Sequence, residues 1–121
     1  IKKLIAHHSI SNNLVTLTAV RPTARFGELE LNGNLVTAFK EKSQLNVGWI
    51  NGGFFVCEPQ LLDFIAGDSV MLEREPIETI AQSSRLGAFK HYGFWQCMDS
   101  KKDHELLQSL CDEGNQVWLD L

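Results

Sequence analysis

The run of apolar and β-branched residues at positions 14–20 constrains the fold of this chain more than any other segment. It reads Leu-Val-Thr-Leu-Thr-Ala-Val, and a short run of this composition is typical of a buried strand. The whole chain has 121 residues, of which 44% are hydrophobic. That size corresponds to one domain or to a piece of a larger one.

A turn signal follows this strand. The dipeptide Asn32-Gly33 stands between two segments with an extended pattern, residues 28–31 and 35–39. Both turn residues tolerate positive φ, so Asn-Gly in this setting predicts a β-hairpin. No internal repeat and no Pro/Gly/Ser-rich linker interrupts the sequence, and we predict no domain boundary within residues 1–121.

A further strand is predicted over residues 47–56, where the pair Gly52-Gly53 interrupts it. Glycine weakens a strand and usually marks either a bulge or a close approach by a ligand or by other backbone. The sequence leaves both interpretations open. Residues 86–98 predict two short strands that meet near Gly93.

Three helices are predicted in the second half of the chain. Pro59 and Pro76 each suit the first position of a short helix. Ser100 and Asp103 form a capping-box pattern before a third helix, which Gly114 ends. Strands and helices together indicate an α/β or an α+β fold. The side chains predicted to face inward are Leu61, Leu62, Phe64 and Ile65 in the first helix, Ile77, Ile80 and Ala81 in the second, and Leu106, Leu107 and Leu110 in the third.

Charge and cysteine content exclude several classes of protein. Lys and Arg number 11 against 15 Asp and Glu, a net charge of −4, which argues against nucleic acid as the main partner. No apolar run approaches the roughly 18–20 residues of a membrane span. Cys57, Cys97 and Cys111 are too far apart for a disulfide framework or a CxxC zinc pattern. We expect a reduced, cytoplasmic environment, with Cys57 and Cys97 as small buried residues.

Glu41-Lys42 is the first candidate for ligand binding. It directly follows the strand predicted at 35–39. A carboxylate accepts hydrogen bonds from pairs of sugar hydroxyls, and a lysine supplies a mobile charge for a phosphate. The alternative is a pair of solvated surface charges.

The segment before the third helix supplies further candidates. Asp99 lies directly before that helix, where a carboxylate suits Mg²⁺; alternatively, Asp99 or Ser100 caps the helix. Trp95 alternates with Phe94, so one of the two rings can face a site. The pair His7-His8 lacks a third metal ligand, and we expect a surface stretch of a helix there.

Five short motifs, taken in order along the chain, resemble those of the carboxyl-terminal half of the glucose-1-phosphate cytidylyltransferases, within the sugar-phosphate nucleotidylyltransferases. The resemblance extends from about His8 to Trp118. The motifs are Arg25-Phe26-Gly27-x-Leu29, Glu41-Lys42, Trp49-Ile50-Asn51-Gly52-Gly53-Phe54-Phe55-Val56, Arg74-Glu75-Pro76 and Gly93-Phe94-Trp95-Gln96-x-Met98-Asp99.

The resemblance implies an α/β fold: a Rossmann-like sheet with flanking helices and a sugar-binding subdomain. Residues 1–121 would be the carboxyl-terminal, sugar-phosphate-binding part, and the amino-terminal nucleotide-binding part, with its Gly-rich loop, is absent. The implied reaction is nucleotidyl transfer from CTP to α-D-glucose 1-phosphate, giving CDP-glucose and pyrophosphate. We expect the isolated chain to be inactive and the complete enzyme to be a cytoplasmic homo-oligomer.

The resemblance also implies roles for single residues. Lys42 would hold the sugar phosphate and Glu41 the glucose hydroxyls. Asp99 would be one of two aspartates that bind Mg²⁺, and Asp99 and Lys42 would be the catalytic residues. The remaining substrate-binding candidates are Gly27, Asn51, Gly52 and Trp95.

Two alternatives remain at this point. The chain can belong to another sugar-1-phosphate nucleotidylyltransferase, which uses UTP or dTTP, because base selection would reside in the absent part. It can also be a non-catalytic module for sugar-phosphate binding or oligomerisation.

Overall fold

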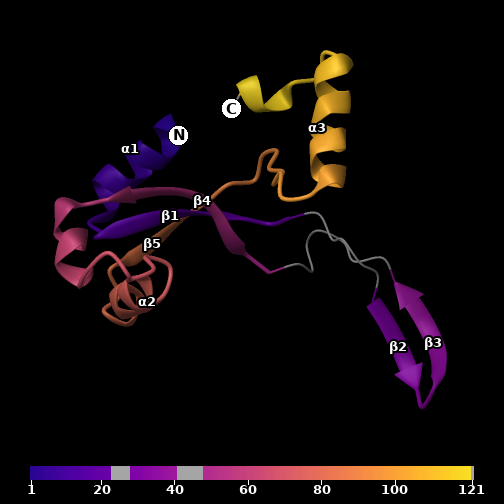
Figure 1. Ribbon diagram of the computed structural model, residues 1–121, viewed down its shortest axis with the longest axis horizontal. Helices are drawn as coiled ribbons and strands as arrows, with labels where there is room; N and C mark the ends of the chain where they lie inside the picture. Colours follow the sequence, from indigo (N-terminus) through magenta and orange to yellow (C-terminus); the bar gives the residue numbers. More distant parts are fainter. Residues whose placement is uncertain (23–27, 41–47, 121) are drawn as a thin grey trace. The chain divides into compact units, whose positions relative to one another are not determined.

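The computed structural model describes residues 1–22, 28–40 and 48–120 (Figure 1). The chain divides into two units. No helix in these ranges is both long enough and apolar enough to cross a membrane. The first unit consists of Ile1–Ala19 and Asn51–His91, and the second of Val20–Ile50 and Tyr92–Leu121.

A mixed three-stranded sheet is the centre of the first unit. Its strands lie in the order β4 (Ile50–Cys57), β1 (Val15–Val20) and β5 (Leu86–Lys90). β1 and β5 are parallel, with Val15 opposite Leu86. β4 runs the other way (Figure 1): the backbone N–H of Glu58 donates to the Leu14 carbonyl, and the Thr18 hydroxyl donates to the Phe54 carbonyl. The predicted buried strand is confirmed as the central strand of this sheet.

Helices cover both faces of the sheet. Neighbouring side chains on β1 point to opposite faces, and both Val15 and Thr16 are fully buried. Helix α1 (Lys2–Ser11) contacts Thr16 through a histidine, whereas helix α2 (Glu75–Gln82) and the 3₁₀ helix η2 (Pro59–Phe64) pack on the Val15 face (Figure 1). The described residues therefore form a small α/β arrangement. The core on the Val15 face is formed by Leu14, Val15, Leu61 and Ile80.

The predicted hairpin is confirmed in the second unit, with its turn one position later. Strand β2 (Glu28–Asn32) pairs antiparallel with β3 (Leu35–Lys40), and Asn32 lies opposite Leu35. Asn32 thus still belongs to the ladder, and Gly33 begins the two-residue turn with φ +58°. The turn is shifted because glycine adopts positive φ at lower cost than asparagine does.

Helix α3 (Lys101–Asp112) begins as predicted. The Ser100 hydroxyl accepts the N–H of Asp103, and the Asp103 carboxylate accepts the N–H of Ser100. This reciprocal capping box satisfies donors that the first helical turn would leave unpaired. Gly114 follows the helix with φ +71°, and a short 3₁₀ helix, η3 (Val117–Asp120), comes after it.

Several predictions of burial are wrong because helix type and helix phase decide which side chains face inward. η2 has three residues per turn, which aligns Leu61 with Phe64 and turns Leu62 away; Leu62 is 70% exposed. Ala81, beside the buried Ile80, is exposed. On α3 the inner row continues from Asp103 to Leu107, so Leu106 is exposed.

The predictions for residues 86–98 and for two cysteines also need correction. Only Leu86–Lys90 forms a strand, and the following residues up to Asp99 have no regular structure. Side-chain hydrogen bonds, described below, hold part of that segment instead of a ladder. Cys57 is exposed because it is the last residue of β4, outside the covered part of that strand. Cys97 is half-buried because it lies in the irregular segment before α3.

Candidate functional site

The predicted site residues fall into three groups. Gly27, Glu41 and Lys42 lie outside the described residues. Asn51 and Gly52 share strand β4 and belong to the first unit. Trp95 and Asp99 share the irregular segment before α3 and belong to the second unit.

β4 is kinked where the sequence has its glycine pair. Gly53 has φ +84° and Phe54 has φ +54°. A non-glycine residue in this left-handed region costs about 1–2 kcal/mol, and strain of this kind is concentrated at turns and functional sites. The Oδ1 atom of Asn51 accepts the N–H of Gly53 at 3.0 Å, which leaves the amide NH₂ group as the donor end of the Asn51 side chain.

The surroundings of this kink match both interpretations of the glycine pair. A Cβ placed on Gly53 would meet no atom within 4 Å, so the glycine is required by its φ rather than by close packing. The Phe54 side chain is 66% exposed, and its carbonyl accepts the Thr18 hydroxyl at 3.2 Å. The backbone of β4 is therefore irregular at Gly53 and Phe54, and the space beside Gly53 is open.

The helix cap before α3 does not use Asp99. Ser100 and Asp103 supply both halves of the capping box, whereas Asp99 is exposed. Of the two predicted capping candidates, Asp99 and Ser100, Ser100 has that role. Asp99 is exposed and lies two residues before the helix begins at Lys101.

Asp103 connects this cap to the residues before Asp99. The Gln96 side-chain amide donates to Oδ1 of Asp103 at 3.0 Å, and the Ser100 hydroxyl donates to Oδ2 at 2.8 Å. Asp103 is only 8% exposed. Sequence reasoning found the capping box but missed Gln96, because nothing in the spacing shows that its side chain turns toward the helix.

The two aromatic residues of this segment differ in their surroundings. The Phe94 ring packs against Trp118 of η3, with 5.8 Å between the ring centroids. Trp95 is half-buried. Phe94 therefore has a packing role in the second unit, and Trp95 stays the candidate of the pair for ligand contact.

A cation–aromatic cluster in the second unit was not predicted. The guanidinium carbon of Arg21 lies 4.5 Å from the centre of the Trp49 ring, and Tyr92 meets the same ring edge-on with centroids 5.4 Å apart. Arg21 follows β1, Trp49 precedes β4 and Tyr92 follows β5. Only the tertiary fold brings these strand ends together, and local sequence patterns carry no signal for that.

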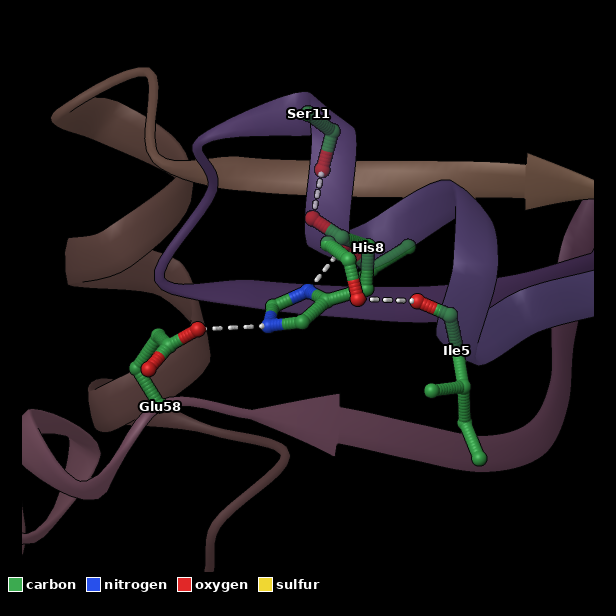
Figure 2. A network of polar contacts seen from close by, with 6 residues as sticks. Ile5, His8, Ser11 and Glu58 are labelled. Atoms are coloured by element: carbon green, nitrogen blue, oxygen red, sulfur yellow. Dashed lines mark hydrogen bonds and ion pairs between the residues drawn. The ribbon is translucent and has the colours of Figure 1, made fainter.

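A buried histidine joins three elements of the first unit (Figure 2). The His8 ring contacts Oγ1 of Thr16 at 2.8 Å through Nδ1 and Oε1 of Glu58 at 3.1 Å through Nε2. An ionised carboxylate only accepts hydrogen bonds, so Nε2 carries a proton and, in the neutral ring, Nδ1 accepts the Thr16 hydroxyl. Figure 2 shows the Glu58 carboxylate aimed at the ring from beyond the end of β4.

The prediction of a surface position is therefore wrong for His8, which is 6% exposed. Leu4 and His8 are four residues apart and form the inner face of α1, and this spacing was the available signal. His7 is half-buried and lies against the Phe89 ring, with 5.6 Å between centroids. In the part of the chain that the structure describes, no three His, Cys, Asp or Glu side chains form a group that could hold a metal ion.

Comparison with known proteins places the chain in a family. No family model matches it. Over 118 residues, 98% of the chain, it is 42% identical to the glucose-1-phosphate cytidylyltransferase of Salmonella typhimurium. The chain is homologous to the glucose-1-phosphate cytidylyltransferases. The homologous stretch makes up 46% of the Salmonella protein, so the chain spans about half the length of the curated relatives it matches.

More distant members of the sugar-1-phosphate nucleotidylyltransferase family match as well. The mannose-1-phosphate guanylyltransferase catalytic subunit beta of Xenopus tropicalis is 30% identical over 108 residues, covering 87% of the chain and 29% of that protein. A crystal structure from Bacillus anthracis, assigned as a glucose-1-phosphate thymidylyltransferase in complex with sucrose, superposes with a TM-score of 0.60 and 10% identity. The superposition covers 96% of this chain and 49% of the Bacillus anthracis chain. The 42% identity to the Salmonella enzyme confirms the resemblance seen in the sequence motifs, and the superposition shows a similar fold.

Proposed function

We propose that this chain supplies the sugar-phosphate site of an enzyme that transfers a cytidylyl group from CTP to α-D-glucose 1-phosphate, giving CDP-glucose and pyrophosphate. The observation that carries the proposal is the 42% identity to a glucose-1-phosphate cytidylyltransferase along 98% of the chain. The motif residues Asn51, Gly52, Trp95 and Asp99 lie within the described ranges.

The substrate contacts follow from the chemistry of each side chain. Lys42 carries the charge that holds the sugar phosphate, and Glu41 accepts hydrogen bonds from glucose hydroxyls. The Asn51 amide donates to a hydroxyl, since its Oδ1 is engaged by Gly53. Gly27, Gly52 and Trp95 are the remaining proposed sugar contacts, and Gly52 precedes the open backbone at Gly53.

Asp99 is the proposed ligand for Mg²⁺. This ion takes one or two carboxylates together with substrate phosphates and waters, and an exposed carboxylate outside the helix cap fits that need. When bound, Mg²⁺ neutralises phosphate charge. Asp99 supplies one anionic ligand, and a second carboxylate comes from the part of the enzyme that this chain does not contain.

The proposed chemistry needs no protein nucleophile. An oxygen of the sugar phosphate attacks the α-phosphate of CTP in line, and pyrophosphate leaves. The protein contributes orientation and electrostatic stabilisation. In this chain those tasks fall to Lys42, which fixes the attacking phosphate, and to Asp99.

Two other functions compete with this one. A different base is compatible with the guanylyltransferase relative and with the thymidylyltransferase structure. A non-catalytic module for sugar-phosphate binding or oligomerisation is the second alternative. We place the complete enzyme in the cytoplasm as a homo-oligomer, and Cys57, Cys97 and Cys111 are all free thiols in the structure.

A chimeric enzyme tests the proposal. The 118 matching residues of the Salmonella enzyme are replaced by those of this chain, and nucleotide sugar is measured by chromatography with CTP, UTP, dTTP or GTP. We expect CDP-glucose from CTP, and no product from the 121-residue chain alone. Lys42→Ala is expected to raise the KM for glucose 1-phosphate about ten- to a hundredfold, with little effect on the KM for CTP. A chimera that folds but forms no nucleotide sugar would favour the binding module.

A further inference from the structure

We propose that Gln96 and Asp103 are positioning residues for Asp99. This inference rests on the proposed function, in which Asp99 binds a divalent cation. Gln96 and Asp103 hold the irregular segment that carries Asp99 against the start of α3. They would thereby set the position of a carboxylate that they do not touch.

The Asp103 carboxylate is the centre of the arrangement. Its Oδ1 accepts the Gln96 amide at 3.0 Å, and its Oδ2 accepts the Ser100 N–H at 3.1 Å and the Ser100 hydroxyl at 2.8 Å. Asp103 is 8% exposed, so water competes little for these bonds. One buried carboxylate therefore binds the chain on both sides of Asp99.

The backbone between these two attachments is short. Only residues 97–99 separate Gln96 from Ser100, and none of them belongs to a helix or strand. The Gln96 amide also donates to the Cys97 carbonyl at 3.0 Å. Asp99 thus lies in a three-residue bridge whose two ends are hydrogen-bonded to the same side chain, and this limits how far its Cα can move.

The Gln96 contact is not needed for the helix cap. A capping box requires only the exchange between the N-cap residue and the third residue of the helix, and here Ser100 and Oδ2 of Asp103 supply it. The bond from Gln96 to Oδ1 is additional. Removing Gln96 therefore loosens the bridge while it leaves the start of α3 capped.

The same helix offers a matched control. The Gln108 amide donates to Oδ1 of Asp112 at 2.8 Å, and this pair is exposed. It has the same chemistry as the pair of Gln96 and Asp103 and lies far along α3 from Asp99. Gln108→Ala should therefore remove a side-chain hydrogen bond of the same kind without affecting residues 97–99.

The test uses the chimeric enzyme, which also contains the second proposed carboxylate, and Mn²⁺ as a paramagnetic probe. Broadening of the Asp99 and Ser100 amide signals in NMR spectra is followed as Mn²⁺ is added. Partners that orient a metal ligand typically change metal affinity ten- to a hundredfold, so we expect Gln96→Ala to weaken Mn²⁺ binding at Asp99 by roughly tenfold. Gln108→Ala should match the unmodified chimera.

Amide hydrogen exchange gives a second readout that needs no metal. Gln96→Ala should speed exchange at residues 97–99 and preserve protection within α3. An unchanged Mn²⁺ dependence in Gln96→Ala would overturn this inference alone. Absence of broadening at Asp99 in the chimera with Gln96 unchanged would overturn both this inference and the metal role of Asp99. A loss of binding as large in Gln108→Ala would show that helix stability, and not positioning, is responsible.

Discussion

Replacement of His8 by alanine is expected to destabilise the first unit by about 1–4 kcal/mol. The Thr16 hydroxyl is fully buried, and without its partner at 2.8 Å it stays unsatisfied. An unsatisfied buried polar group costs roughly 1–3 kcal/mol. Glu58 is 51% exposed, so water replaces much of its lost contact and that part adds about 1 kcal/mol or less.

The assay is urea unfolding of the 121-residue chain, followed by circular dichroism. The free energies of unfolding of wild type and of His8→Ala are compared at equal pH, under conditions where the transition is two-state. His7→Ala is the matched control, since this neighbour is half-buried and contacts the Phe89 ring, whereas His8 is buried and hydrogen-bonded at both ring nitrogens. We expect it to change the free energy of unfolding by about 1 kcal/mol or less.

A double variant separates hydrogen bonding from packing. Replacing both partners of a buried hydrogen bond by apolar groups is often nearly neutral. The pair His8→Leu and Thr16→Val should therefore be less destabilised than the sum of the two single variants. Equal effects of His8→Ala and His7→Ala, or strict additivity in the double variant, would refute the reasoning.

Three further predictions concern other positions. Asp99→Asn in the chimeric enzyme should lower kcat roughly 10²–10³-fold without changing its thermal unfolding; full activity across a Mg²⁺ titration would contradict the metal role. Gly87→Ala should lower the free energy of unfolding by about 1 kcal/mol, because the added Cβ meets the Asn13 side chain; Asn13→Ala in the same chain should restore most of the loss. Although the Cys57 residue is exposed, the protein atoms around its thiol partly desolvate it, and this raises the pKa of the thiol. The pKa of the thiol is thus higher in the folded than in the unfolded state. The resulting contribution to the free energy of unfolding is complete below the unfolded-state pKa, and it is lost as the pH rises from there through the folded-state pKa. Wild type should therefore lose stability relative to Cys57→Ser between pH 8 and about pH 10, as measured by urea unfolding.

Local patterns predicted the elements whose determinants are adjacent in the sequence. The strand that contains Val15, the hairpin around Gly33 and the cap at Ser100 each depend on a few consecutive residues. The type of η2 was not predictable, because a 3₁₀ and an α-helix share the same start at Pro59. That difference decided the exposure of Leu62.

The sequence predicted candidate site residues only where they belong to a recognisable motif. Asp99 could be singled out by its place before a helix, but its exclusion from the cap needed the structure. The contacts of His8 with Glu58 and of Arg21 with Trp49 join residues that are far apart in the sequence. Such contacts depend on the packing of whole elements, which periodicity and turn chemistry do not specify.

The strand order of the sheet also affects how the chain folds while it is being synthesised. The central strand holds Val15, and its parallel partner begins at Leu86, 71 residues later. A ribosome adds about 5–20 residues per second, so β1 waits roughly 4–14 s for β5 to be synthesised. During that interval one of the most apolar stretches of the chain has no complete sheet to join, and non-local pairing of this kind is slow to form. In the cell, the yield of folded protein would then depend on what shields residues 14–20 while the chain is still being made.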